Sequence, residues 1–177
     1  MQGLTTFAYA VGQIFATLLP TLCYLAALSL FLFAGWGFWR QAQPDNPFRG
    51  KPWVPITGLL FCGVFASFPK FLTMANRSAG SSITVGVSSL SSYSAPTSSS
   101  SILGTTPADS VVAIVQTFQL FFQAFGAMMA FAAMYALWST MRGTSRRTPG
   151  ACFVQFVFAV MLINVVTVSQ WLVGFFT

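Results

Sequence analysis

The sequence predicts an all-α integral membrane protein with four transmembrane helices and an additional apolar helix at the N-terminus. Of its 177 residues, 55% are hydrophobic and only 6% are charged, whereas charged residues make up about 25% of a soluble domain. Long uncharged runs alternate with short polar stretches, and most of the basic residues lie in two of these stretches. This arrangement is typical of a chain that crosses a bilayer several times.

The first uncharged run extends from Leu4 to Trp39. As one helix it would be roughly 54 Å long, nearly twice the ~30 Å hydrocarbon core. Because Pro20 cannot donate a backbone hydrogen bond, we expect a break there. The prediction is an interfacial or partly inserted N-terminal helix over residues 1–18 and a first span from Leu19 to Trp39, with one long kinked helix as the alternative. No basic residue precedes this run, which argues against a cleaved signal peptide.

Residues 19–75 are expected to form a first helical hairpin. A proline-broken basic loop follows Arg40, and the second span is predicted from Trp53 to Met74. Trp53 suits the interfacial aromatic belt, and Lys70 near the far end can extend its ammonium group to the interface.

Residues 76–109 differ in composition from the rest of the chain, because thirteen serines lie between Ser78 and Ser110 inclusive. Such a segment cannot bury enough apolar surface to fold alone, so we expect an extracytoplasmic loop that is flexible or ordered by a partner. Alternating Ile83, Val85 and Val87 leave open a short strand that pairs with a neighbouring chain.

Residues 110–177 are expected to form a second hairpin with an Arg-rich cytoplasmic turn. Asp109 and Ser110 are candidate N-caps for a helix from Val111 to Trp138, and the last span is predicted from Ala151 to Phe176.

Polar and small side chains inside the second hairpin are the candidate sites of helix–helix contact. An unpaired amide is costly in lipid, so each should meet another polar group. The predicted polar contacts are Gln116, Gln119, Gln123, Gln155, Asn164 and Gln170. Close packing is predicted at Gly126, Ala130 and Ala133. Ordinary helix packing is the simpler interpretation of both sets, and a pore lined by the first three glutamines is the alternative.

The basic residues predict the topology. Six of the eight lie in the two short loops, where we expect them to contact lipid headgroups: Arg40, Arg49, Lys51, Arg142, Arg146 and Arg147. The positive-inside rule places these loops in the cytoplasm. The N-terminus, the Ser-rich loop and the C-terminus then face outward, which in a Gram-negative cell means the periplasm, together with the two exceptions, Lys70 and Arg77.

Composition also argues against enzyme chemistry. The chain has no His, and Asp45 and Asp109 are its only carboxylate side chains, so we expect no enzyme, no cofactor and no metal site. Cys23, Cys62 and Cys152 lack metal or redox spacing and are expected to be reduced packing residues. No phosphate-binding glycine motif is present, and no direct nucleic-acid site is evident.

The order of these elements resembles the IcmC/DotE family of Dot/Icm type IVB secretion systems and the TraQ-type conjugal transfer proteins of IncI-like plasmids. The resemblance covers most of the chain and rests on element order and on short segments of two spans. In the second span these are Gly58, Leu59 and Leu60, then Pro69, Lys70, Phe71 and Leu72. In the last span they are Ile163, Asn164, Val165 and Val166, then Gln170 and Trp171.

The resemblance implies a non-enzymatic structural subunit of the bacterial inner membrane, oligomeric with itself or with other membrane subunits of a secretion or conjugation machine. It also implies that Asn164 and Gln170 form interhelical hydrogen bonds and that Gly58 and Pro69 shape the second span. Two alternatives remain open at this point: a pilin-like subunit of an extracellular conjugative filament, and a small oligomeric channel or holin-like pore.

Overall fold

The computed structural model describes residues 2–44, 53–81, 114–116 and 118–175, and among these residues it is all-helical, with no strand. The first half contains α1 (Gln2–Gln41), α2 (Trp53–Ala66) and α3 (Phe68–Ser78). The second half contains α6 (Gln119–Met141), α7 (Pro149–Ile163) and α8 (Val165–Gly174). The expected Ser-rich loop beyond residue 81, the alternative strand at 83–87 and the expected N-caps Asp109 and Ser110 lie outside the described residues.

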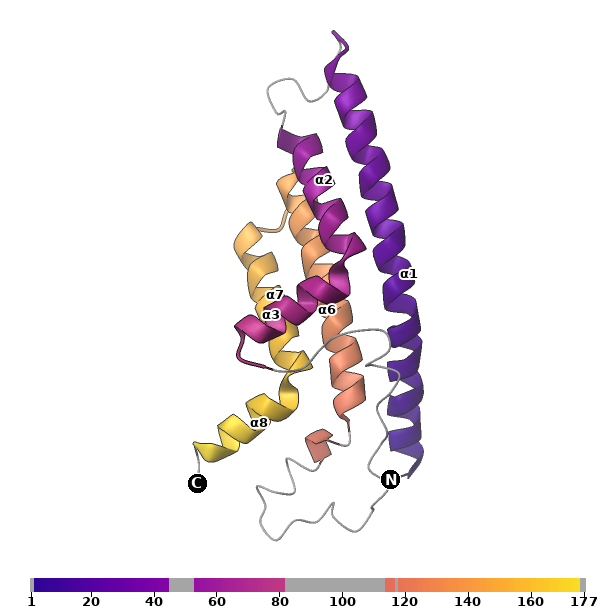
Figure 1. Cartoon of the computed structure of the whole chain (residues 1–177). Helices are drawn as coiled ribbons and strands as arrows, with labels where there is room; N and C mark the ends of the chain where they lie inside the picture. The colour runs from indigo at the N-terminus through magenta and orange to yellow at the C-terminus, as the bar shows by residue number, and fades with distance from the viewer. Residues whose placement is uncertain (1, 45–52, 82–113, 117, 176–177) are drawn as a thin grey trace.

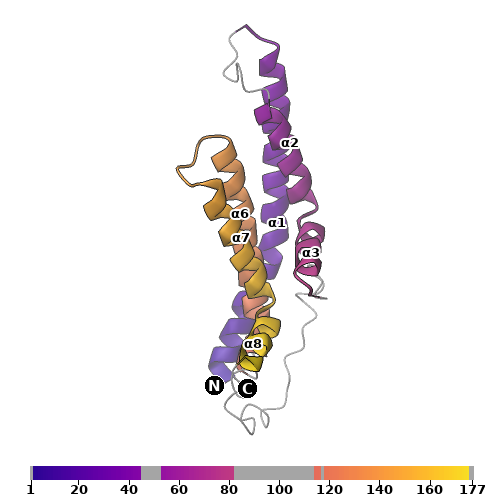
Figure 2. The ribbon, with the colours of Figure 1, turned by 90° about the vertical axis from the view of Figure 1, so that its left-hand side faces the viewer.

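Four helices, α1, α2, α6 and α7, run side by side along the long axis of the molecule, while α3 and α8 turn away from it (Figure 1). Helix α6 is central, because it contacts α1, α2, α7 and α8. The C-terminal end of α1 and the turn between α6 and α7 point towards one end, and both termini lie at the other (Figures 1 and 2).

Helix α1 is continuous over 40 residues, with Pro20 inside it. The expected break at Pro20 is therefore wrong, and residues 1–18 do not form a separate helix. The reason is a stripe of buried residues that continues across the proline at helical spacing: Ala8, Gly12, Ala16, Leu19, Cys23, Ala26, Leu30 and Ala34. Near the proline, the hydroxyls of Thr17 and Thr21 donate to backbone carbonyls of the preceding turn at 2.8 and 2.7 Å, an arrangement that helps membrane helices tolerate proline.

The predicted second span is bent by 83° at Ser67, where α2 ends and α3 begins. Pro69 occupies the first turn of α3, where its missing N–H is tolerated. The rings of Phe65 and Phe68, on either side of the bend, both pack against Phe131 of α6, with centroids 5.2 and 6.0 Å away. Packing on α6 therefore stabilises the bend.

The predicted last span is also bent by 83°, at Asn164 between α7 and α8. Helix α6 begins at Gln119, with Phe118 at its N-cap position. Residues 114–116 before it are also helical, and the predicted start at Val111 lies outside the described residues. By length and composition, α1 and α6 can each cross a membrane, and the count rises to four if each bent pair is one span.

Candidate functional site

A pair of buried asparagines joins the two halves of the molecule. The side-chain Nδ2 of Asn164 donates to Oδ1 of Asn76 at 3.1 Å, across 88 positions of sequence. Asn76 is fully buried and Asn164 is 5% exposed, and they are the two buried polar residues of the described core. A hydrogen bond between amides is worth most where water cannot compete for either partner.

Asn164 also stabilises the bend between α7 and α8. Its Nδ2 donates to the carbonyl of Val160 at 2.8 Å, and its backbone N–H lies within hydrogen-bonding distance of the carbonyls of Val160 and Met161. Its own carbonyl accepts from the N–H of Val168, in the first turn of α8. Asn164 thus provides hydrogen-bond partners for carbonyl groups at the end of α7 and for one backbone N–H at the start of α8.

The other amide atom of Asn164, Oδ1, is buried and has no hydrogen-bond partner. Burying a carbonyl oxygen without a hydrogen-bond partner costs free energy. The two hydrogen bonds donated by Nδ2 offset this cost in the bent conformation. Among the described residues, no group of three or more His, Cys, Asp or Glu side chains is placed so that it could hold a metal ion.

Asn76 was not among the site residues expected from the sequence, which placed it at the start of the Ser-rich loop. It lies in the last turns of α3, on the same buried face as Phe68 and Leu72. The spacing of these three residues, i, i+4 and i+8, is the helical signal that could have identified Asn76 as a buried residue.

The predicted glutamine face is not gathered into one buried site. Gln116 is exposed, Gln119 and Gln123 are half-buried, and Gln170 is exposed on α8. Gln155 accepts a hydrogen bond from Arg147 at 3.2 Å, and this bond joins α7 to the turn before it. Of the six side chains predicted to make polar contacts, Asn164 forms a buried hydrogen bond between the two halves of the molecule.

The predicted small residues lie where α6 is closely packed. Gly126, Ala130 and Ala133 are all buried. A Cβ on Gly126 would lie 2.8 Å from Cγ1 of Ile163 and 2.9 Å from the carbonyl oxygen of Ala159, both on α7. Gly58 of α2 is also buried, facing Phe33 of α1.

Three of the four described basic residues of the two turns contact aromatic rings or polar groups. The guanidinium of Arg142 lies over the rings of Phe33 and Trp138, at 4.2 and 5.5 Å, and that of Arg40 lies 5.6 Å from Trp36. Arg146 is exposed. The contact between Arg142 and Phe33 connects the Arg-rich turn to α1. Arg49 and Lys51 lie outside the described residues.

Comparisons with protein families, with curated proteins and with solved structures found no match to this chain. The described part of the chain is all-helical, and by length and composition two to four candidate spans place it in the class of α-helical membrane proteins.

Proposed function

We propose that this chain is a non-enzymatic structural subunit of the bacterial inner membrane, assembled with other membrane subunits of a type IVB-like secretion or conjugal transfer apparatus. In this proposal the chain crosses the membrane four times, α1 providing the first span and each bent pair counting as one. The basic turns face the cytoplasm and both termini face the periplasm. The sequence resemblance and the positive-inside rule support this arrangement.

The observation that carries the proposal is the length of α1. With 40 residues it is roughly 60 Å long, twice the hydrocarbon thickness. It extends past the turn between α6 and α7 (Figure 2). Three large aromatic side chains near its C-terminal end are 43–61% exposed: Trp36, Phe38 and Trp39.

An apolar patch outside the hydrocarbon region is typical of a contact between proteins. A helix that carries aromatic residues beyond its own bundle suits a subunit that docks on neighbouring membrane proteins. Aromatic side chains are also enriched among residues that dominate binding energy.

The test is affinity purification of the C-terminally tagged chain from its native host in mild detergent, with mass spectrometry of the membrane fraction and of sheared extracellular material. We expect envelope-spanning transfer proteins to co-purify from the membrane. Replacing Phe38 and Trp39 with Gln should reduce their recovery. The matched control, Leu25→Gln and Leu28→Gln, changes two exposed residues of the same helix nearer its middle and should retain partners if the chain still inserts.

Two outcomes would contradict the proposal. Recovery of most of the chain in sheared filaments would favour the pilin-like subunit. A homo-oligomer without partners that leaks solutes, and that stops leaking when Gln116, Gln119 and Gln123 are replaced with Leu, would favour the pore.

A further inference from the structure

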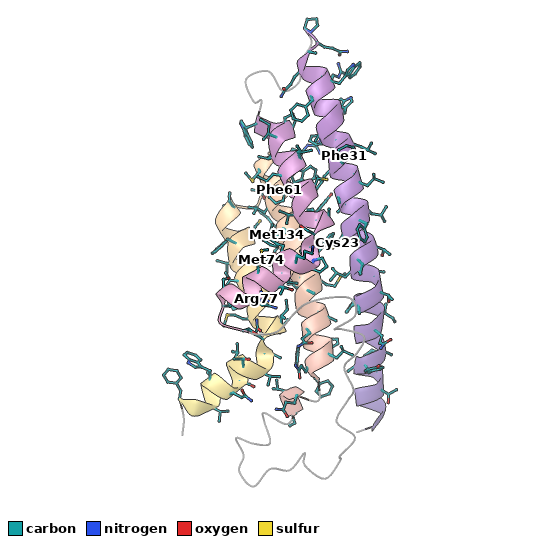
Figure 3. All side chains as sticks on the ribbon, viewed as in Figure 1. Cys23, Phe31, Phe61, Met74, Arg77 and Met134 are labelled. Atoms are coloured by element: carbon teal, nitrogen blue, oxygen red, sulfur yellow. The ribbon has the colours of Figure 1, made fainter. Side chains whose placement is uncertain are left out.

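Helix α3 has two chemically different faces. Its inner face is buried through Phe68, Leu72 and Asn76, and Phe71 packs against Phe156 of α7, with ring centroids 5.8 Å apart. Its outer face exposes Lys70, Met74, Arg77 and Ser78. Figure 3 shows Met74 and Arg77 on the ribbon of α3, which crosses the bundle.

The described residues include no acidic side chain that could neutralise the two cations on the outer face. Lys70 and Arg77 are seven residues apart, so they lie on one side of the helix and about 10 Å apart along its axis. Asp45 and Asp109, the only acidic residues of the chain, are outside the described residues. In the described part of the chain, neither basic side chain has an ion pair or a side-chain hydrogen bond. The site is therefore complementary to anions.

The position of α3 indicates which anion. Helix α2 runs for 14 residues from Trp53, about 21 Å, before the chain bends by 83°. The bend thus carries α3 across the bundle, away from the end towards which the C-terminal end of α1 and the turn between α6 and α7 point (Figures 1 and 3). A helix with an apolar inner face and a basic outer face, lying across a membrane bundle, has the form of an interfacial helix.

We infer that the outer face of α3 binds the phosphate groups of anionic phospholipids in the leaflet opposite the basic turns. Lys70 and Arg77 would donate to headgroup oxygens, and Met74 between them would lie in the same hydrated headgroup layer. Arg and Lys both bind phosphate through charge-assisted hydrogen bonds. This inference requires membrane insertion but not the transfer apparatus, so it stands or fails independently of the proposed function.

The binding test is native mass spectrometry of the full chain in detergent, titrated with phosphatidylglycerol or phosphatidylcholine. The double variant Lys70→Gln, Arg77→Gln should need about thirtyfold more phosphatidylglycerol for the same occupancy, in line with two lost headgroup contacts. Its phosphatidylcholine binding should not change. The charge-conserving variant Lys70→Arg, Arg77→Lys should bind like the wild type. Equal phosphatidylglycerol binding by all three proteins, or a parallel loss of phosphatidylcholine binding, would overturn the inference.

A second measurement locates α3 without removing its charges. The Met74→Cys variant in spheroplasts should react with a membrane-impermeant maleimide added from outside. Leu60→Cys, on the exposed side of α2, should not react, because that side chain faces the hydrocarbon core. The wild type gives the background from its three native cysteines. If the Met74→Cys variant is labelled only after the chain is denatured, or only after the cells are opened, the proposed location in the outer headgroup layer is wrong.

Discussion

At Gly126 a single hydrogen atom in place of a side chain permits the close approach of α6 and α7. A methyl group there would lie under 3.0 Å from both a side-chain carbon of Ile163 and the backbone oxygen of Ala159, and a backbone atom cannot move without shifting its helix. We predict that Gly126→Ala lowers the free energy of unfolding by about 1–3 kcal/mol, the usual range for overpacking. Reversible unfolding in mixed micelles measures it.

The control for this prediction is Gly63→Ala. Gly63 lies within α2, and an added Cβ would meet nothing within 4 Å. Because alanine is the better helix former, this change should be neutral or stabilising, by up to about 1 kcal/mol. An equal loss of stability in both variants would mean that the close contact at Gly126 is not the cause.

The bond between Asn76 and Asn164 is a second residue-scale prediction. Replacing either residue with Leu removes their hydrogen bond. We expect a double-mutant cycle to give an interaction energy between about 0.6 and 1.7 kcal/mol, the average and the maximum found for such contacts in a membrane protein. Gln170→Leu, at an exposed position, should leave stability nearly unchanged. Strict additivity of the two asparagine variants would contradict the bond.

At the scale of the element, α7 begins with a side-chain cap. Thr148 is the N-cap residue, Pro149 follows it, and the hydroxyl of Thr148 accepts from the backbone N–H of Ala151 at 3.4 Å. Thr148→Ala should lower the free energy of unfolding by about 1 kcal/mol, whereas Thr148→Ser should retain most of it. Thermal unfolding of the three proteins in one detergent compares them. A serine variant as unstable as the alanine variant would count against the cap.

Sequence alone predicted the helical class and the approximate location of the apolar segments, because the hydrophobicity of long uncharged runs is a local property. It did not predict the bends. Pro69 is visible in the sequence as a helix breaker, but Pro20 is equally visible and α1 continues through it. The two prolines differ in the tertiary contacts around them. The buried stripe of α1 continues across Pro20, whereas the residues on either side of Ser67 pack on Phe131 and stabilise a bend.

The bend at Asn164, in the candidate site, could not be predicted from the sequence either. An interhelical hydrogen bond was expected at Asn164 from the sequence, but its partner, which lies 88 positions away, could not be named. No proline or glycine marks the bend. Its geometry depends on Asn164 Nδ2 bonding both Val160 and Asn76, and long-range contacts of this kind leave no local pattern in a single sequence.

For the whole molecule, the two halves follow one plan. Each has a long apolar helix, then an antiparallel helix of 14 or 15 residues, then an 83° bend and a helix of 11 or 10 residues. The helices before the bends, α2 and α7, are only about 21 and 22 Å long. Both are shorter than the ~30 Å hydrocarbon core, whereas the 23 residues of α6 extend to about 35 Å.

This mismatch leads to a prediction about the bilayer. If α3 lies in the headgroup layer, lipid beside α2 must be thin, and the cost of mismatch will rise as acyl chains lengthen. We expect the thermal stability of the protein in nanodiscs to be greatest in a phosphatidylcholine whose hydrocarbon core is thinner than ~30 Å, and to fall steadily in longer-chain members of a monounsaturated series. A maximum at the thickness that matches α6 would instead mean that α3 and α8 lie within the hydrocarbon, as re-entrant segments packed on the bundle. Maleimide labelling of Met74→Cys in the same nanodiscs separates these cases, since a headgroup position should stay reactive across the series whereas a re-entrant one should not react in any lipid.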